Sequence, residues 1–250
     1  MLGTGTVAPS PNRTAAAYWV EAGPVRLLLD CGAGTLHRAA LYRIPWPSVT
    51  HVAISHFHLD HWGELPMLLF ALRHGTLPPR SSPLTLLGPR GLAGRLTLLA
   101  SAYGDWLLND DFALQIRELA PGEVAELAAE VTLETFKTKH TPESLALAVR
   151  HGTVRLIYTA DTGMSDDLSR WAQGCDLLLA ECSLPDREGM EIHLTPSQVG
   201  RLARAAAARG LVLTHFSPQV EGTDPAGVAA QAFGGKVVAA QDGDRFVIGS

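Results

Sequence analysis

The sequence predicts an α/β fold in which two β-sheets are faced by helices. Short apolar runs, typical of buried strands, alternate with helical stretches along the 250 residues of the chain. Hairpins and meanders come early and in the centre, and strand–helix alternation follows, so the order is mixed. Two sheets covered by helices would bury all of these runs. Hydrophobic residues make up 46% of the chain and charged residues 18%, a globular composition that argues against disorder.

Apolar runs of four to eight residues predict nine strands, and most of these runs are bounded by Gly, Pro, Asp or Asn. In chain order the predicted strands are Val25–Asp30, Val52–Ser55, Leu84–Leu87, Phe112–Ile116, Val131–Thr138, Leu145–Arg150, Val154–Ala160, Asp176–Ala180 and Leu211–Thr214. Between Thr132 and Tyr158, three strands follow one another with only short connections, which is typical of a meander.

The predicted helices are Leu65–Arg73, Leu92–Ala102, Asp166–Trp171 and Ser197–Arg209. The last of them has a start signal in Thr195-Pro-Ser, a cap followed by proline in the first turn, and a stop signal in Gly210. No linker, low-complexity run or block of charge marks a boundary, and about one domain is expected at this length. We therefore expect a single domain over residues 1–250.

Composition and cysteine count exclude several broad classes of protein. No apolar stretch approaches the roughly 20 residues that cross a bilayer. The start of the chain lacks the basic and apolar regions of a signal peptide. The three cysteines form no CxxC pair, so we expect no disulfide framework and a cytoplasmic location. The net charge of −5 disfavours electrostatic binding of nucleic acid over a broad surface, although binding through a local basic cleft stays an alternative.

The segment directly after the second predicted strand is dense in metal-ligand residue types, with His56, His58, Asp60 and His61 within six residues. Neutral imidazole and carboxylate are ligands that a borderline-soft ion such as zinc prefers. His56 and His58 lie two residues apart on an extended turn, so their side chains point the same way. Asp60 and His61 come where the chain turns into the next helix and can aim at a second point nearby. One segment can thus serve two metal ions.

Further ligand-type residues stand where other predicted strands end, namely His140, Asp161, Glu181 and His215. Open α/β sheets gather their sites at the carboxyl ends of strands. Five strand ends, each closing on a His, Asp or Glu, therefore predict one convergent site.

The histidine cluster and several further blocks carry a family resemblance. An HxHxDH signature is met in full by His56, His58, Asp60 and His61. Further blocks are Leu2-Gly-Thr-Gly-Thr, Leu28-Leu-Asp-Cys-Gly-Ala-Gly, Tyr158-Thr-Ala-Asp-Thr, Leu179-Ala-Glu, His193-Leu-Thr and Leu213-Thr-His. With these blocks in this order, nearly the whole chain resembles the metallo-β-lactamase superfamily and, within it, the ribonuclease Z-like branch. The resemblance implies a metallo-β-lactamase-type αββα sandwich of two mixed sheets flanked by helices.

The same resemblance implies two divalent metal ions. Zinc is the expected ion, with Mn²⁺ or Fe²⁺ as alternatives, because imidazole and carboxylate accept all three. The implied ligands are His56, His58 and His140 for the first ion and Asp60, His61 and His215 for the second, with Asp161 bridging the two. Two ions about 3.5–4 Å apart can hold a hydroxide between them and lower its pKa towards neutrality. With a phosphodiester, they would also neutralise the non-bridging oxygens as charge builds in the transition state.

Three catalytic candidates follow from the resemblance. Asp60 is one of them as well as a ligand. His193 would protonate the departing oxygen, and Glu181 would orient a histidine and fix its tautomer. An alkoxide leaves poorly, so such a proton donor is worth roughly 10²–10⁴-fold. The residues alone leave two alternatives open: His193 as a residue near the cap of the helix after Thr195, and Glu181 as a buried structural hydrogen-bonding group.

One departure from the branch bears on the substrate. Transfer-RNA 3′-processing enzymes of this branch carry a long flexible arm, which in the bacterial short form lies between the third-histidine block and the bridging aspartate. Here only 21 positions separate His140 from Asp161, and the predicted meander fills them. The chain also has only three lysines, Lys137, Lys139 and Lys236. These features favour a small anionic diester over extended nucleic acid.

The leading hypothesis is a dinuclear metal-dependent phosphodiesterase that cleaves a small diester through a metal-bridging hydroxide. Alternatives are lactonase, esterase, sulfatase or β-lactamase-type hydrolysis at the same site, transfer-RNA 3′ processing without the arm, and a metal-holding binding protein with little turnover. The branch resemblance implies a homodimer, with a candidate apolar surface around Leu65–Phe70 and Trp106–Leu108 that could also be core. A monomer on gel filtration at micromolar concentration would contradict the homodimer.

A few side chains outside the cluster have plainer interpretations. Four apolar side chains could line the mouth of a pocket, belong to the core or form a dimer surface: Trp62, Phe70, Trp106 and Leu107. Arg73 and Arg80 could steer an anion, but ordinary solvated arginine is favoured. Cys182 could touch a metal, but a small buried hydrophobe is favoured.

Overall fold

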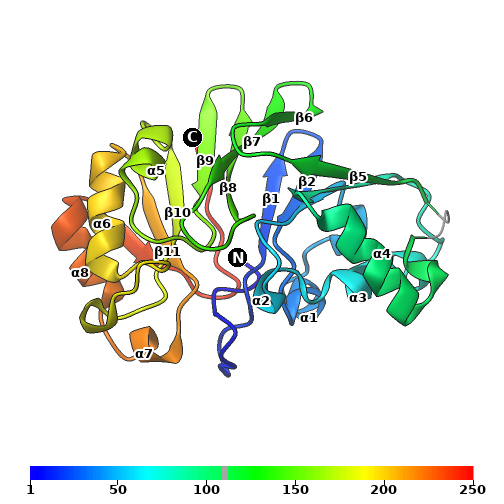
Figure 1. The fold of residues 1–250 in the computed structure, drawn as a ribbon, viewed down its shortest axis with the longest axis horizontal. Helices are drawn as coiled ribbons and strands as arrows, with labels where there is room; N and C mark the ends of the chain where they lie inside the picture. Colours follow the sequence, from blue (N-terminus) through cyan, green and yellow to red (C-terminus); the bar gives the residue numbers. More distant parts are fainter. Residues whose placement is uncertain (109–111, 250) are drawn as a thin grey trace.

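The computed structural model describes residues 1–108 and 112–249, and in it two sheets pack face to face between two layers of helices (Figure 1). Both sheets combine parallel and antiparallel strands, so both are mixed. The predicted fold class is confirmed: this is an α/β sandwich with the layer order α, β, β, α.

The first sheet begins with the hairpin of β1 (Tyr18–Ala22) and β2 (Val25–Leu29), whose strands pair antiparallel. Three strands then add in parallel: β3 (His51–Ala53), β4 (Leu84–Pro89) and β5 (Leu114–Leu119). Because β2, β3 and β4 are parallel, their carboxyl ends lie at one edge of the sheet, where the HxHxDH segment leaves β3.

The second sheet has the strand order β12-β11-β10-β9-β8-β7-β6. Its antiparallel part is the meander of β6 (Val124–Ala128), β7 (Val131–Lys137), β8 (Leu145–His151) and β9 (Val154–Tyr158). Its parallel part adds β10 (Leu177–Glu181), β11 (Leu211–Thr214) and β12 (Val237–Ala239) to β9. The carboxyl ends of β9, β10 and β11 therefore also meet at one edge.

Helices cover the outer face of each sheet (Figure 1). On the side of the first sheet lie α1 (Thr35–Leu41), η1 (Trp46–Ser48), α2 (Leu59–Trp62), α3 (Leu65–His74), α4 (Leu92–Tyr103) and η2 (Asp105–Leu108). On the side of the second lie α5 (Asp166–Trp171), η3 (Asp186–Glu188), α6 (Pro196–Ala205), α7 (Pro218–Glu221) and α8 (Pro225–Phe233). No helix within 1–108 and 112–249 is both long enough and apolar enough to cross a membrane.

The apolar residues of each strand alternate between two cores. Leu27 and Leu29 of β2 point into the core between the sheets, where they join Tyr158 and Leu179 of the second sheet. Leu28 points outward and packs with the helices of the first side. Side chains on a strand alternate in this way with period two. The runs looked uniformly apolar in the sequence because both faces of each sheet are buried.

All nine predicted strands are present, with ends shifted by up to three residues. Three further strands, β1, β6 and β12, were not predicted, nor were α1, α2, α7 and α8. The last predicted helix was wrong at its end. It stops at Ala205 rather than Arg209, because Ala207 has a left-handed φ of 46° and the Arg209 N–H bonds to the Cys175 carbonyl instead. The helix begins at Pro196, one residue before the predicted Ser197. The predicted start signal was right, since Thr195 is the N-cap and forms a capping box with Gln198.

The solvated interpretation of Arg73 and Arg80 was wrong. Both side chains are buried, at 5% and 8% exposure. The Arg80 guanidinium donates to the backbone carbonyls of Pro47, Val49, Ser82 and Pro83. Arg73 donates to the carbonyls of Trp106 and Leu107. Both arginines therefore hold loops of the first helical layer in place, and neither is free to steer an anion.

Candidate metal centre

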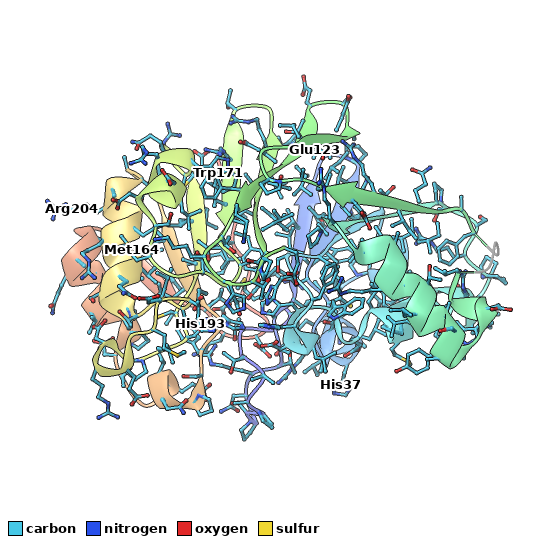
Figure 2. All side chains as sticks on the ribbon, viewed as in Figure 1. His37, Glu123, Met164, Trp171, His193 and Arg204 are labelled. Atoms are coloured by element: carbon cyan, nitrogen blue, oxygen red, sulfur yellow. The ribbon has the colours of Figure 1, made fainter. Side chains whose placement is uncertain are left out.

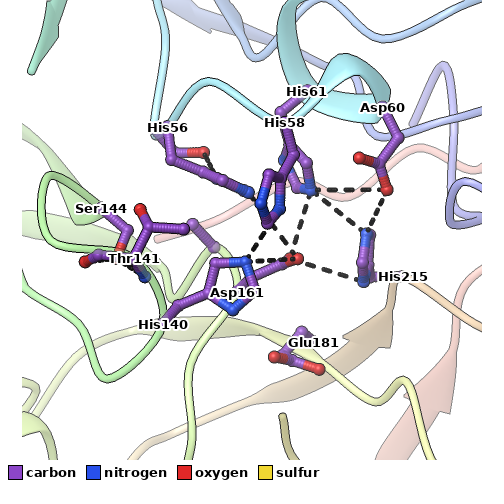
Figure 3. Close-up of polar contacts among 12 residues, drawn as sticks. His56, His58, Asp60, His61, His140, Thr141, Ser144, Asp161, Glu181 and His215 are labelled. Carbon is purple, nitrogen blue, oxygen red and sulfur yellow. Dashed lines mark hydrogen bonds and ion pairs between the residues drawn. The ribbon is translucent and has the colours of Figure 1, made fainter. Parts of the chain in front are cut away.

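Figure 2 draws the side chains on the ribbon, with His193 labelled. The predicted ligands converge at the edge where the parallel strands of both sheets end, as the close-up in Figure 3 shows. His56 and His58 lie in the segment after β3, while Asp60 and His61 begin α2. The other three follow strands of the second sheet: His140 comes after β7, Asp161 after β9 and His215 after β11. The seven side chains thus come from both sheets, and the sandwich brings them together.

The seven side chains form two groups. The first group is His56, His58, His140 and Asp161, and the second is Asp60, His61 and His215; within each group, one ligand-type atom per residue lies within 4.8 Å of the others. In the first group, His140 Nε2 lies 3.0 Å from His58 Nδ1. In the second, His61 Nε2 lies 3.2 Å from His215 Nε2 and 3.9 Å from Asp60 Oδ2. Each group has the number and kind of donors that a divalent ion takes.

Asp161 faces both groups (Figure 3). Its Oδ1 lies 3.3 Å from His61 Nε2 and 3.4 Å from His215 Nδ1. Its Oδ2 lies 3.6 Å from His140 Nε2 and 3.9 Å from His56 Nε2. A carboxylate with one oxygen towards each group has the geometry of a bridging ligand.

Two buried polar atoms show that the cluster fits metal ions. Within the described part of the chain, neither His56 Nε2 nor Asp161 Oδ1 has a hydrogen-bond partner. A buried polar atom left unpaired costs about 1–3 kcal/mol. Both atoms point into the cluster, where a cation bound between the two groups would satisfy them.

Asp30, which follows β2, is a residue whose role sequence reasoning missed. It is fully buried, and its carboxylate accepts a hydrogen bond from His61 Nδ1 at 2.7 Å and one from the Tyr158 hydroxyl at 2.7 Å. Ser55 donates to it twice, through its N–H at 2.7 Å and its hydroxyl at 2.8 Å. Asp30 therefore fixes the ring of His61 so that Nε2 faces the cluster. The sequence signal that could have identified Asp30 is its position at the end of a predicted strand, within the block Leu28-Leu-Asp-Cys-Gly-Ala-Gly.

The same carboxylate acts on a second histidine through a serine. The Ser55 hydroxyl gives its proton to Asp30, so at 3.0 Å it accepts from His56 Nδ1. This arrangement assigns the proton of His56 to Nδ1 and leaves Nε2 free as a ligand. Burial and the neighbouring histidines lower the pKa of His56 to about 2, so its ring is neutral, as a metal ligand must be.

Glu181, at the end of β10, repeats this pattern on the other side of the cluster. The Ser183 hydroxyl donates to Glu181 Oε2 at 2.5 Å and accepts from His215 Nδ1 at 2.8 Å. The other oxygen, Oε1, accepts from His193 Nδ1 at 3.0 Å and from the N–H of Thr162 at 2.7 Å. One buried carboxylate therefore orients both His215 and His193.

His193 lies beside the metal-type cluster but outside both groups. Its ring centroid is 4.9 Å from that of His140 and 6.4 Å from that of His215. Burial alone would lower the pKa of His193. The hydrogen bond and the negative charge of Glu181 more than offset that effect and hold the pKa above its usual 6.5. A histidine held in this way has the properties of a proton donor near neutral pH.

The carboxylates of the cluster are ionised. Burial opposes ionisation of Asp161, but His215, His61 and His56 hold its pKa well below the usual range. For Asp60, the hydrogen bond with His215 and the charge of His61 outweigh burial and lower the pKa to about 2. Anionic oxygens and imidazole nitrogens gathered at one point form a donor set suited to divalent cations.

Residues 25–216, well over half of the chain, match the family described as the beta-lactamase superfamily domain. The chain belongs to the metallo-β-lactamase superfamily.

Individual relatives narrow this assignment. An uncharacterized protein of Mycobacterium leprae is 32% identical over 253 residues, covering 99% of this chain and 87% of that protein. A ribonuclease Z of Haloferax volcanii is 26% identical, covering 99% and 93%. The crystal structure of the metallo-β-lactamase fold protein YhfI from Bacillus subtilis matches with a TM-score of 0.85 and 25% identity, covering 97% and 96% of the two chains. This metallo-β-lactamase superfamily member is thus ribonuclease Z-like, and it is a metal-dependent hydrolase.

The region between His140 and Asp161 carries no arm in this hydrolase. It consists of β8 and β9, which pair antiparallel through a tight turn at Gly152. The alignment with the Haloferax volcanii ribonuclease Z runs over 304 positions, whereas this chain has 250 residues. That relative therefore has segments without a counterpart here.

Other candidate residues lie in the apolar layers. Trp62 and Leu107 are buried core residues, and Cys182 is fully buried in the core of the second helical side and belongs to neither group of ligand candidates. Phe70 and Trp106 are in edge-to-face contact at 5.0 Å, with Phe70 42% exposed. A cavity of about 500 Å³ lies between the sheets under the C-terminal segment, but none of the residues that line it is a ligand candidate. The ligand-type residues therefore gather at the strand ends and not in that cavity.

The orienting role of Asp30 leads to a prediction about metal affinity. Asp30→Asn keeps the shape of the side chain but removes the charge that holds His61, so we expect metal affinity about 10–100-fold weaker. Competition against a chromophoric chelator measures that affinity. Asp105→Asn, a change at an exposed carboxylate of η2, serves as the matched control. Equal affinities for the two variants would show that Asp30 does not orient a ligand.

Proposed function

We propose that this protein hydrolyses a small phosphodiester, with two divalent metal ions at the cluster and His193 as the acid that protonates the leaving alkoxide. The single observation that carries the proposal is the Glu181–His193 hydrogen bond of 3.0 Å beside the cluster. Hydrolysis of an ester with a good leaving group needs no such proton donor, whereas an alkyl phosphodiester does.

The proposed metal ligands are the residues of the two groups. His56, His58, His140 and Asp161 would hold one ion, and Asp60, His61, His215 and Asp161 the other. Bound divalent ions would supply an activated water and neutralise the phosphate oxygens. Zinc is the proposed ion, because three imidazoles dominate the first group and two imidazoles the second.

The residues of the chain perform three tasks in this proposal. Asp30 holds His61 directly, and Glu181 holds His215 through Ser183, so that a ring nitrogen of each faces the cluster. Asp161 keeps the two groups at a fixed separation. His193, with Nδ1 donating to Glu181, presents Nε2 as the atom that gives a proton to the departing oxygen. As that proton leaves, Glu181 retains the hydrogen bond from Nδ1 and so keeps the ring in position.

Two features support a small substrate. The chain lacks an arm between His140 and Asp161, and two of its three lysines are engaged in local contacts. Lys137 donates to the carbonyls of Thr138 and Thr141, and Lys139 donates to the carbonyl of Met164. These ammonium groups therefore stabilise the loops around His140, and they are poorly placed to neutralise a run of phosphates.

Homodimer formation and a cytoplasmic location stay predictions. Met67 and Phe70 on α3 are 54% and 42% exposed, so part of the candidate dimer surface is on the outside of the protein. Leu65 and Leu107, by contrast, belong to the core. If a dimer forms through this surface, the outer side of α3 is the part that contributes.

A hydrolysis panel with metal-quantified protein tests the proposed function. We expect bis(p-nitrophenyl) phosphate to be hydrolysed well above p-nitrophenyl phosphate and a simple lactone, with the activity lost on chelation and restored by the metal. The p-nitrophenyl reporter makes the first two rates directly comparable. A preference for the lactone would keep the metal centre but overturn the proposed bond.

A further inference from the structure

We propose that Met190 forms an apolar wall beside the leaving group, so that this hydrolase selects diesters whose departing alcohol is apolar. The inference rests on the proposed function, because it names the kind of alcohol that His193 protonates. It assigns a specificity role to a residue that takes no part in the chemistry.

The first step is the geometry of the turn that carries His193. Met190 and His193 are partners in an isolated antiparallel bridge, with Glu191 and Ile192 as the turn residues between them. Directly opposed residues of an antiparallel pair have their side chains on the same face, with Cβ atoms about 4.5–5.5 Å apart. Because the His193 ring lies against the rings of the cluster, the side chain of Met190 is on the cluster side of the turn.

The second step is that this turn has a fixed position relative to the cluster. The Ile192 carbonyl accepts from His140 Nδ1 at 3.3 Å. Gly163 packs against the turn so closely that a Cβ there would lie 1.6 Å from the Glu191 carbonyl oxygen. The Gly163 N–H in turn donates to the Lys139 carbonyl at 2.9 Å. The segments that carry Asp161, His140 and His193 are thereby tied together, and Met190 is held with them.

The third step is the chemistry that Met190 offers. Its side chain is 51% exposed, although a thioether gains from being covered. It is flexible and polarisable, so it adapts to flat rings and alkyl chains alike. Glu191, the next residue, is exposed and adds a negative charge that disfavours a leaving group with further phosphates. The chemical class that suits this wall is therefore an uncharged, apolar or aromatic alcohol.

The position of His193 decides which end of the substrate meets Met190. The acid must lie next to the departing oxygen, within about 2.6–3.2 Å. The group attached to that oxygen therefore extends along the face that His193 and Met190 share. The group that remains on the phosphate points away from this face.

A diester with two different alcohols tests the inference by internal competition. In 2-phenylethyl methyl phosphate, both ester groups derive from primary alcohols of similar acidity, so the ratio of 2-phenylethanol to methanol released reports which group occupies the leaving side. With metal-loaded wild-type protein we expect an excess of 2-phenylethanol of about 10-fold, the effect of a modest apolar contact. Gas chromatography measures both alcohols from one reaction, so the ratio does not depend on metal occupancy or enzyme concentration.

Three variants provide the comparison. Met190→Gln keeps the length of the side chain but makes it polar, and should bring the ratio close to one. Met190→Leu keeps the apolar surface and should preserve the excess. Met67→Gln makes the same change at a 54% exposed methionine on α3 and should leave the ratio at the wild-type value.

The outcomes separate the inference from the function on which it rests. A wild-type ratio near one, or an unchanged ratio in Met190→Gln, would overturn the role of Met190 while the diester is still cleaved. If the wild-type protein released neither alcohol, the phosphodiesterase assignment itself would fall, and the role of Met190 with it.

Discussion

His193→Ala is expected to lower kcat for an alkyl phosphodiester by about 10²–10⁴-fold, while turnover of bis(p-nitrophenyl) phosphate falls by less than about 10-fold. An alkoxide needs a proton as it departs, and His193 is the group that Glu181 holds ready to give it. A nitrophenolate is stable without that proton. The steady-state rates of the two substrates, measured on the same metal-quantified preparation, give the comparison.

The pH dependence provides a second readout of the same variant. The alkyl reaction needs the protonated form of His193, whose pKa Glu181 holds above 6.5. Wild-type activity on the alkyl diester should therefore fall as the pH rises through this raised pKa of His193, and this decline should be absent from the residual activity of His193→Ala. His37→Ala, at an exposed histidine of α1, is the control and should change neither rate. Equal losses on both substrates would show that His193 is not the leaving-group acid.

Much of the centre could be predicted because its ligands follow apolar strands. Parallel strands bring their carboxyl ends to one edge, so His140, Asp161 and His215 were placed from their position after a strand alone. The groups that orient these ligands were harder to predict. Glu181 was identified as a tautomer-fixing group, but its link through Ser183 to His215 depends on a side-chain contact that no spacing indicates.

Asp30 was missed for a similar reason. A lone aspartate after a strand is common, and only the fold shows that it accepts four hydrogen bonds, two from Ser55 and one each from His61 and Tyr158. Tyr158 comes from the other sheet, more than a hundred residues away. Contacts of this kind depend on how the two sheets face each other, and the local sequence does not encode that.

The errors in the fold also have physical causes. β12 has three half-buried residues, and its pattern is too short to distinguish a strand from a loop. The last predicted helix was extended to Arg209 because alanine and arginine favour helix, but the chain leaves the helix at Ala206 to pair with the segment around Cys175. Arg80 was taken as solvated because arginine usually is, whereas four carbonyls here satisfy its guanidinium inside the protein.

Asp30 and Glu181 together show how the centre is held. Each is a buried carboxylate at a strand end, and each binds one histidine directly and a second through a serine. One comes from the first sheet and the other from the second, so each sheet orients ligands with its own carboxylate. Four histidine rings then have their orientations set before any ion binds, which lowers the cost of assembling the site.

Asp161→Ala is expected to reduce the bound metal from two ions per chain to at most one and to lower kcat/KM for the diester by about 10³-fold or more. Asp161 is the residue whose two oxygens face the two groups, and it is 2% exposed. Without it, the single carboxylate of Asp60 would be the one anionic ligand left to compensate two divalent charges in a partly buried site, which is unfavourable. Metal analysis after gel filtration gives the stoichiometry, and bis(p-nitrophenyl) phosphate gives the rate.

The controls for this variant separate loss of the bridge from loss of the fold. Asp166→Ala changes an exposed carboxylate at the start of α5, five residues away, and should keep both ions and full activity. Asp161→Asn keeps the size of the side chain but removes the charge, so it should lose metal as Asp161→Ala does if the charge is what matters. Circular dichroism should show the wild-type spectrum for all three variants. If Asp161→Ala retained two ions and activity within about 10-fold of wild type, Asp161 would not bridge the two groups, and the ions would have to be held by the histidines and Asp60 alone.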